Sequence, residues 1–246
     1  MNSPYLSYTL ALEPFQLFSP SHLISLLLTV LLAFVLFICR RMLRKPSADV
    51  LARSLLAGVL ALSELCFQLW HVWTNTWSIG EALPLQLCSV MLLLSMFMLL
   101  TGSYRLYEVT FFAGICGATQ ALLTPELFYP FPHFRFIHFF VAHAGIVLAC
   151  LYMTWVRGYR PTFASVLKSM AVLNLLLLIA LPVNHWTGAN YLFVSRKPEN
   201  PSLIDFLGPH PWYILSLEAV ALVLFTLLYL PFRLRRRAAH PKRLDA

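Results

Sequence analysis

The sequence has little charge, few acidic residues and none of the cysteine pairs that mark disulfide-rich or zinc proteins. Only 11% of its 246 residues are charged, 59% are hydrophobic, and Asp and Glu together number 10. A chain this apolar is predicted to be a membrane protein and not a soluble domain. Its five cysteines form no Cys-x-x-Cys pair, so neither a disulfide framework nor a zinc site is indicated. We expect no metal ion and no other cofactor.

The chain also lacks internal repeats, low-complexity segments and domain boundaries, so we expect one domain over residues 1–246. Its apolar residues fall into runs of about 17 to 25, each long enough to cross a hydrocarbon core of roughly 30 Å. The first run is too long and too far from the start for a cleaved signal peptide. The runs predict an all-α bundle of seven transmembrane helices, at about 22–39, 50–73, 83–101, 107–123, 133–156, 162–184 and 212–232.

Positive charge is distributed unevenly between the two predicted sides of the membrane. Of the 18 Lys and Arg residues, 15 follow spans one, three, five and seven, and the other side receives Arg135, Arg196 and Lys197. Because basic residues are retained on the cytoplasmic side, we predict an outer N-terminus and a cytoplasmic C-terminus. The basic tail, 233–246, is expected to rest on anionic headgroups and not on nucleic acid. We expect an integral protein of a bacterial cytoplasmic membrane.

Polar residues within the spans gather toward the predicted outer side, where seven of the eight histidines lie. In the second span, Glu64, Gln68, His71 and Asn75 follow at helical spacing, which places them on one face. An ionisable group at mid-membrane usually faces the bundle interior, a partner or a water-filled cavity. That face is therefore either a structural hydrogen-bond seam between helices or part of a functional site.

The third span begins with "LPLQLCS", residues 83–89, which places a thiol among polar neighbours. Pro84 is interpreted as a first-turn residue, so Cys88 is expected a little over one turn into the membrane from the outer side. Gln86 and Ser89 flank it. A histidine within hydrogen-bond reach would make the thiol a nucleophile. The alternative is that Cys88 is an inert small hydrophobe, as buried cysteines usually are.

The fifth span carries two histidines in "PHFRFIHFFVAHAG", residues 132–145. His138 and His143 are five residues apart, about 140° around a helix, so they do not share a face. His143 lies roughly 15 Å below His133, too deep for a ring at the membrane interface. It needs a polar partner, which a purely structural contact could also supply. By depth alone, His138 matches Cys88 better than His143 does.

Four longer motifs resemble one known family. They are "LPLQLCS" at 83–89, "GATQALLTPEL" at 117–127, "PHFRFIHFFVAHAG" at 132–145 and "NYLFVSRKPENPSLIDFLGPHPWY" at 190–213. Together they cover most of residues 80–232, and the last is the most specific. Through them the chain resembles the seven-span integral membrane family that includes the bacterial YwaF-like proteins and eukaryotic transmembrane protein 164.

The resemblance implies an acyltransferase that moves a fatty acyl chain between glycerophospholipids without coenzyme A. It assigns the nucleophile to Cys88 and the base to His143, with an acyl-cysteine intermediate. A lipid substrate fits a shallow thiol, so we expect the site to open to the outer leaflet and to take phospholipids and lysophospholipids. Candidate oxyanion stabilisers are Gln86, Ser89 and Asn174. Supporting residues that we expect at the headgroup or elsewhere in the site are Gln68, His71, Lys197, Asp205, Glu64 and His138.

Two functions of other classes stay open. Glu64, Gln68 and His71, together with Glu218 in the seventh span, could line a pathway for a proton or a small solute. Against this, no span is interrupted by a Gly/Pro break at mid-membrane, and seven helices do not divide into inverted repeats. The chain could also be a non-catalytic receptor or sensor.

Overall fold

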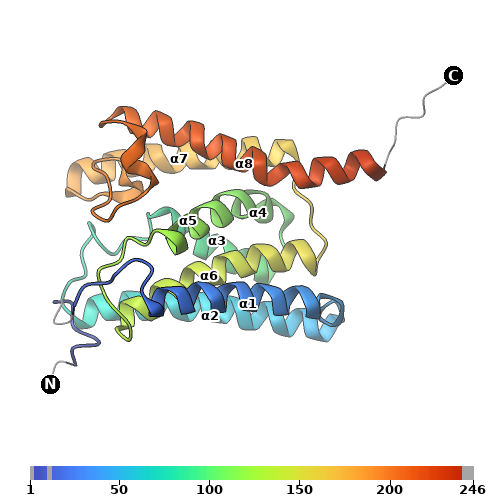
Figure 1. The fold of residues 1–246 in the computed structure, drawn as a ribbon, viewed down its shortest axis with the longest axis horizontal. Coiled ribbons are helices and arrows are strands. Elements are labelled where there is room, and N and C mark those ends of the chain that lie inside the picture. The colour runs from blue at the N-terminus through green and yellow to red at the C-terminus, as the bar shows by residue number, and fades with distance from the viewer. Residues whose placement is uncertain (1–2, 10–12, 240–246) are drawn as a thin grey trace.

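The computed structural model describes residues 3–9 and 13–239, and these ranges form a bundle of helices without a strand (Figure 1). The elements are α1 (Pro20–Leu43), α2 (Pro46–Trp73), α3 (Leu87–Thr101), α4 (Tyr104–Val109), the π-helical turn η1 (Thr110–Gly114), α5 (Ile115–Leu123), α6 (Phe134–Trp155), α7 (Phe163–Thr187), the 3₁₀ turns η2 (Tyr191–Phe193) and η3 (Leu203–Leu207), and α8 (Trp212–Ala239). The fold is therefore all-α, as the apolar runs predict.

Within the described residues, six helical segments are long and apolar enough to cross a membrane. One of them is the continuous stretch Tyr104–Leu123, in which α4, η1 and α5 follow one another. The predicted third span is the exception, because α3 has only 15 residues. At 1.5 Å per residue it extends about 22 Å, less than the roughly 30 Å of a hydrocarbon core.

The predicted start of the third span, at residue 83, is wrong by four residues. Pro84 lies in a turn before α3 and not in its first helical turn. Two contacts hold the preceding residues out of the helix: the Leu83 N–H donates to the Tyr191 hydroxyl at 3.1 Å, and the Leu85 N–H donates to the Leu83 carbonyl at 2.8 Å. The residue before a proline also disfavours helical backbone angles.

The last helix is longer than predicted. The expected span ended at residue 232, with a basic tail over 233–246, whereas α8 continues to Ala239. The first part of that tail is therefore helical. Residues 240–246, with Lys242 and Arg243, lie outside the described residues.

The helices form layers, as Figure 1 shows. The α7–α8 pair makes one outer layer and rests on α4 and η1, while α1 and α2 lie on the opposite side of the bundle. Between them, α6 packs against α1, α2, α3 and α5. Because α6 contacts helices on all sides, more than half of its apolar length is buried.

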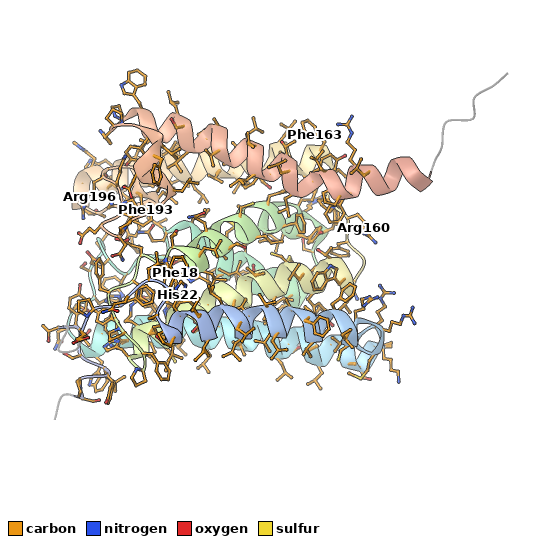
Figure 2. All side chains as sticks on the ribbon, viewed as in Figure 1. Phe18, His22, Arg160, Phe163, Phe193 and Arg196 are labelled. Carbon is orange, nitrogen blue, oxygen red and sulfur yellow. The ribbon has the colours of Figure 1, made fainter. Side chains whose placement is uncertain are left out.

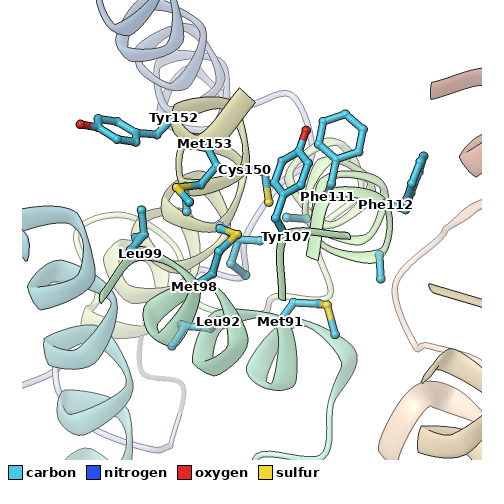
Figure 3. Close-up of a cluster of buried hydrophobic side chains, with 14 of the residues drawn as sticks. Met91, Leu92, Met98, Leu99, Tyr107, Phe111, Phe112, Cys150, Tyr152 and Met153 are labelled. Atoms are coloured by element: carbon cyan, nitrogen blue, oxygen red, sulfur yellow. The ribbon is translucent and has the colours of Figure 1, made fainter. Parts of the chain in front are cut away.

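The core lies where α3, η1 and α6 meet. Figure 3 shows its side chains, which include Met91, Leu92, Met98, Leu99, Tyr107, Phe111, Phe112, Cys150, Tyr152 and Met153. A close backbone approach occurs at Gly114, where a Cβ would lie 3.1 Å from Cγ2 of Ile146 and 3.9 Å from Cβ of Met91. Met91, Gly114 and Ile146 therefore mark one level of the bundle.

The two ends of the bundle differ in composition. Figure 2 labels Arg160 and Phe163 at one end and Phe193 and Arg196 at the other. We call the first the arginine end, formed by residues 40–53, 102–105 and 156–162. We call the second the loop end, formed by residues 74–86, 124–133 and 188–211. The two helices α3 and α6 both begin at the loop end, so they run parallel.

Candidate active site

Cys88 is the second residue of α3, at the loop end of the bundle, and is half-buried. It thus lies in the first turn of α3, not below it as the sequence predicted. The first N–H groups of a helix have no partner within it, and no side chain caps those of α3. The thiol is therefore beside unpaired backbone donors and the positive end of a helix dipole.

The start of α3 is held by a loop that follows α7. The Gln86 side chain, at the N-cap of α3, accepts the Leu192 N–H at 3.0 Å and donates to the Asn190 carbonyl at 3.4 Å. The Tyr191 hydroxyl donates to the Ile79 carbonyl at 2.6 Å. Through these two contacts the Gln86 amide positions the helix start, and its second N–H keeps no partner among the described residues.

The same loop is tied back to its own helix by Asn184. The Asn184 amide donates to the Tyr191 carbonyl and accepts the Tyr191 N–H, both at 2.9 Å. Sequence reasoning assigned no role to these two residues. The signal was present, because Tyr191 belongs to the "NYLF" start of the most specific motif, but nothing in the sequence pairs residue 191 with residue 83 or residue 192 with residue 86.

His143 is buried in α6, and its ring orientation is fixed by one hydrogen bond. Its Nδ1–H donates to the Phe139 carbonyl at 2.7 Å, one helical turn earlier. That bond assigns the proton of a neutral imidazole to Nδ1 and leaves the lone pair on Nε2. Nε2 is therefore the atom that can accept a proton.

His143 lies on the face of α6 that is turned toward η1. At about 100° per residue, it lies within about 20° of Cys150 and about 60° of Ile146. The Cys150 thiol donates to the Thr110 carbonyl of η1 at 3.3 Å, and Ile146 is at the close approach to Gly114. This face of α6 therefore meets η1, against which α3, the helix that carries Cys88, also packs.

Cys88 and His143 lie in the same layer of the bundle. Each is one helical turn nearer the loop end than the level marked by Gly114. Gly117 of α5 lies at that level too, and a Cβ there would be 3.9 Å from Sγ of Cys88, so the α5 backbone passes close to the thiol. His143 makes its hydrogen bond to Phe139, and none joins it to Cys88 within the described residues.

His138 faces a different helix. It lies within about 20° of Gly145, where a Cβ would meet Leu60 of α2 at 2.7 Å. Its ring stacks on Phe67 of α2 at 4.9 Å between centroids, and its Nδ1 accepts from Nη1 of Arg135 at 2.9 Å. Its Nε2 is buried without a partner. Met91 and Ile146 lie at one level, and each is three residues after Cys88 and His143 respectively, so the packing of α3 and α6 places Cys88 level with His143, whereas the depth count from the sequence favoured His138.

The polar face of α2 is hydrogen-bonded to the loop before α3. The Gln68 amide donates to Oε1 of Glu64 at 2.8 Å and to the Ala82 carbonyl at 2.9 Å. His71 is buried, with Nδ1 at 2.9 Å from Oγ1 of Thr76. These residues form a seam that joins α2 to the segment leading to Cys88.

The comparisons with known proteins agree with the motif resemblance. The model of the TMEM164 family matches residues 17–229, which run from just before α1 into α8 and include both Cys88 and His143. The chain belongs to the TMEM164 family. No curated protein and no solved structure matches it. The membership establishes a multi-pass membrane protein of this family and assigns no reaction to it.

In this family member, Ser89 is half-buried beside Cys88, and the other candidate residues lie elsewhere. Asn174 of α7 donates to Oε2 of Glu218 of α8 at 2.9 Å, and the two helices lie on the side of the bundle opposite α2 (Figure 1). In the loop end, Lys197 donates to the Asp205 main-chain carbonyl at 3.3 Å. The Asp205 carboxylate itself caps η3.

Two cavities can be described, and neither is lined by Cys88 or His143. A small one of about 130 Å³ lies at the loop end between Phe15 and Pro201. A larger one of about 400 Å³ lies at the arginine end.

The described residues contain no group of three or more His, Cys, Asp or Glu side chains that could hold a metal ion.

Proposed function

We propose that this membrane protein of the TMEM164 family is a phospholipid acyltransferase that needs no coenzyme A. Cys88 is the nucleophile and His143 the base. The observation that carries the proposal is the shared layer of the two side chains, together with the tautomer that leaves Nε2 of His143 free to take a proton. The resemblance to eukaryotic transmembrane protein 164 supports the same assignment.

The proposed reaction has two transfers. Nε2 of His143 takes the thiol proton of Cys88 while Sγ attacks the sn-2 ester carbonyl of a phospholipid. The ester C–O bond then breaks, the leaving oxygen receives the proton from His143, and an acyl-cysteine and a lysophospholipid result. In the second transfer, the hydroxyl of an acceptor lysophospholipid gives its proton to His143 and attacks the thioester, and the thiol is released.

The oxyanion stabiliser in this proposal is the start of α3. The unpaired N–H groups of Leu87, Cys88 and Ser89 point away from the helix at the level of the thiol. Backbone donors at a helix N-terminus favour negative charge without any side chain. The amides of Gln86 and Asn174 already have partners, so we assign them no part in this step.

The proposal includes the orientation in the membrane. We infer that α3 and the turn before it make a seventh crossing, with the loop end outside and the arginine end in the cytoplasm. The split of 15 basic residues to three supports this, as does the placement of the start of α1 and the end of α8 at opposite ends of the bundle (Figure 1). The site would then serve the outer leaflet. A C-terminal reporter that is active only in the cytoplasm tests the orientation.

The solute pathway is the weaker candidate on geometry. It requires Glu218 to continue the line formed by Glu64, Gln68 and His71, yet α8 and α2 lie on opposite sides of the bundle (Figure 1). Glu218 is hydrogen-bonded to Asn174, and Gln68 to the loop before α3. Capture of an acyl-cysteine, described next, distinguishes a non-catalytic receptor from an enzyme.

The deciding experiment is capture of an acyl-cysteine. Purified protein in liposomes of a phospholipid with a labelled sn-2 chain is unfolded and treated with N-ethylmaleimide to block free thiols, then with hydroxylamine to free any acylated cysteine, and is bound to a thiol-reactive resin. We expect one acylated cysteine, at Cys88, which disappears in Cys88→Ser. Cys116→Ser, a half-buried cysteine of α5, is the matched control and should keep the adduct. Acylation that persists in Cys88→Ser, or none in the unaltered protein together with no acyl exchange, refutes the proposal.

A further inference from the structure

The larger cavity, at the arginine end, has no part in the proposed acyl transfer. Its volume is about 400 Å³, and it lies between the end of α1, the start of α2 and the segment after α6. Its lining consists of Arg44, Pro46, Asp49, Val50, Arg53, Val156, Arg157 and Tyr159. Sites for small ligands commonly have volumes of a few hundred Å³.

The charge of the lining is positive. Three arginines stand against one carboxylate, which leaves two net positive charges. That carboxylate, Asp49, is buried and fully engaged: Oδ2 accepts from Arg53 and Arg157, each at 3.1 Å, and Oδ1 accepts from the Tyr152 hydroxyl at 3.0 Å. Asp49 therefore holds the two guanidinium groups in place and offers no oxygen to a cation.

The arginines keep nitrogens that bond neither to Asp49 nor to a main-chain carbonyl. Arg53 uses Nε on Asp49 and Nη1 on the Leu99 carbonyl, which leaves Nη2. Arg44 uses Nε and Nη2 on the Val156 and Trp155 carbonyls, which leaves Nη1. Arg157 uses Nη1 on Asp49, and its side chain is 40% exposed. The cavity thus presents fixed, accessible N–H donors of like charge, an arrangement that matches the oxygens of a phosphate group.

One wall of the cavity continues into the lipid-facing surface of α2. Val50 lines the cavity and is 56% exposed, and the next residue, Leu51, is 60% exposed. A ligand with its phosphate on the arginines could therefore lay an acyl chain against apolar side chains. The N-terminus of α2, at Pro46, also faces this cavity and adds positive potential.

We propose that this cavity binds the phosphate group of an anionic membrane lipid in the leaflet at the arginine end. The guanidinium groups supply the charge, and the exposed face of α2 supplies the contact for the chain, which free phosphate would not use. Basic pockets between helix ends are known to bind lipid headgroups. The site lies at the other end of the bundle from Cys88, so it does not depend on the proposed acyl transfer.

The test measures lipid binding by the full-length protein in detergent micelles, using native mass spectrometry. The probes are phosphatidylglycerol, phosphatidylcholine and inorganic phosphate. Arg44→Gln is compared with Arg41→Gln, which removes the same charge from the same end of α1 but does not line the cavity. Circular dichroism and gel filtration confirm that both variants are folded. Activity is not used as a readout.

We expect one molecule of phosphatidylglycerol to bind to each protein, with a higher affinity than phosphatidylcholine has. Arg44→Gln should lower the affinity for phosphatidylglycerol by about tenfold or more, because a charge-assisted hydrogen bond is lost. Arg41→Gln should weaken it by no more than about fivefold, the general effect of one surface cation. Equal losses in the two variants, or no preference over phosphatidylcholine, overturn the proposal. Displacement of the lipid by inorganic phosphate at equal concentration would assign the site to free phosphate and overturn the lipid assignment.

A second variant keeps the test decisive if Arg44→Gln does not fold. Arg157→Lys preserves the positive charge beside Asp49 but loses the planar fork of the guanidinium group. It should weaken phosphatidylglycerol binding more than Arg41→Gln does. If it binds the lipid as the unaltered protein does, the cavity is not the site.

Discussion

The two ends of the bundle satisfy their polar groups in different ways. All three ion pairs of the described residues lie at the arginine end or in the first turns of the helices that leave it, and they join Asp49 to Arg53 and Arg157, and Glu108 to Lys168. At the loop end and in the helix turns next to it, polar side chains such as those of Gln86, Asn184 and His143 bond to main-chain carbonyls and N–H groups.

The difference indicates what each end can do. Fixed charges with an excess of guanidinium groups attract an anion at any physiological pH, because arginine does not lose its proton. Of the three neutral groups, the amides of Gln86 and Asn184 do not titrate and fix the backbone, whereas the imidazole of His143 can gain or lose a proton without breaking an ion pair. The side of the bundle with His143 therefore suits proton transfer, and the arginine end suits recognition of a charged ligand.

The largest expected effect separates the two histidines of α6. His143→Ala should lower the initial rate of acyl transfer by about 10² to 10⁴, the usual contribution of a general base. His138→Ala should lower it by less than about tenfold, because its ring packs on Phe67 away from α3. The rates are measured with labelled phospholipid in liposomes, after gel filtration of both variants. A larger loss of rate in His138→Ala than in His143→Ala would mean that His138 is the base.

The next largest effect tests the arginine end by removing its central carboxylate. Asp49→Ala should destabilise the protein by about 3 to 5 kcal/mol, because Arg53, only 13% exposed, would be left without its partner. Glu108→Ala should cost about half as much or less, since Lys168 is 56% exposed and can turn to water. Unfolding in mixed detergent micelles measures both variants. Equal costs would mean that burial of the cation does not distinguish the two pairs.

A smaller effect is expected at the contact that holds the start of α3. Gln86→Leu leaves the Leu192 N–H and the Asn190 carbonyl unpaired, at a cost of about 1 to 3 kcal/mol. Hydrogen exchange at Leu192 should accelerate, and alkylation of Cys88 should change in rate. Gln120→Leu is the control, because its amide bonds only within its own helix end, to Thr124. Identical exchange in the two variants would show that Gln86 does not fix the loop.

The smallest expected effect depends on pH and concerns Glu126, between α5 and α6. Burial raises the pKa of this carboxyl, although the N–H groups of Glu199 and Asn200 act against the rise. Because the pKa of Glu126 is higher in the folded than in the unfolded protein, its protonated carboxyl favours folding. That contribution is fully present below the unfolded pKa of about 4.3 and is lost as the pH rises through the folded pKa. Glu126→Gln should remove this slope and change stability by no more than about 1 kcal/mol. The slope of stability against pH is measured from thermal unfolding midpoints between about pH 4 and 7. An unchanged slope in Glu126→Gln would mean that another group causes it.

Much of the fold follows from local patterns. The bounds of α2 and α6 are close to those predicted, because an apolar run long enough to cross lipid folds as a helix whatever its neighbours are. The resemblance of four motifs to one family is confirmed by the match over residues 17–229. The roles of Cys88 and His143 stay predictions, because no contact between the two groups and no ligand tests them.

The start of α3 could not be predicted from "LPLQLCS". Whether residues 83–86 are helical depends on Tyr191 and Leu192, more than 100 residues later, whose partners are Leu83 and Gln86. Such a contact leaves no pattern in the neighbouring sequence. It also holds the start of α3, where Cys88 lies.

The sequence by itself determined that this chain is a helical membrane protein, which family it belongs to and which residues carry reactive groups, since these depend on composition, run length and motif. The tertiary structure decided which of those residues meet. It turned His138 to α2 and the face of α6 that carries His143 toward η1, and it joined Arg44, Asp49 and Arg157 around one cavity. The physical reason is that helix packing fixes the faces and levels of distant segments relative to one another, and neither quantity is encoded in any single helix.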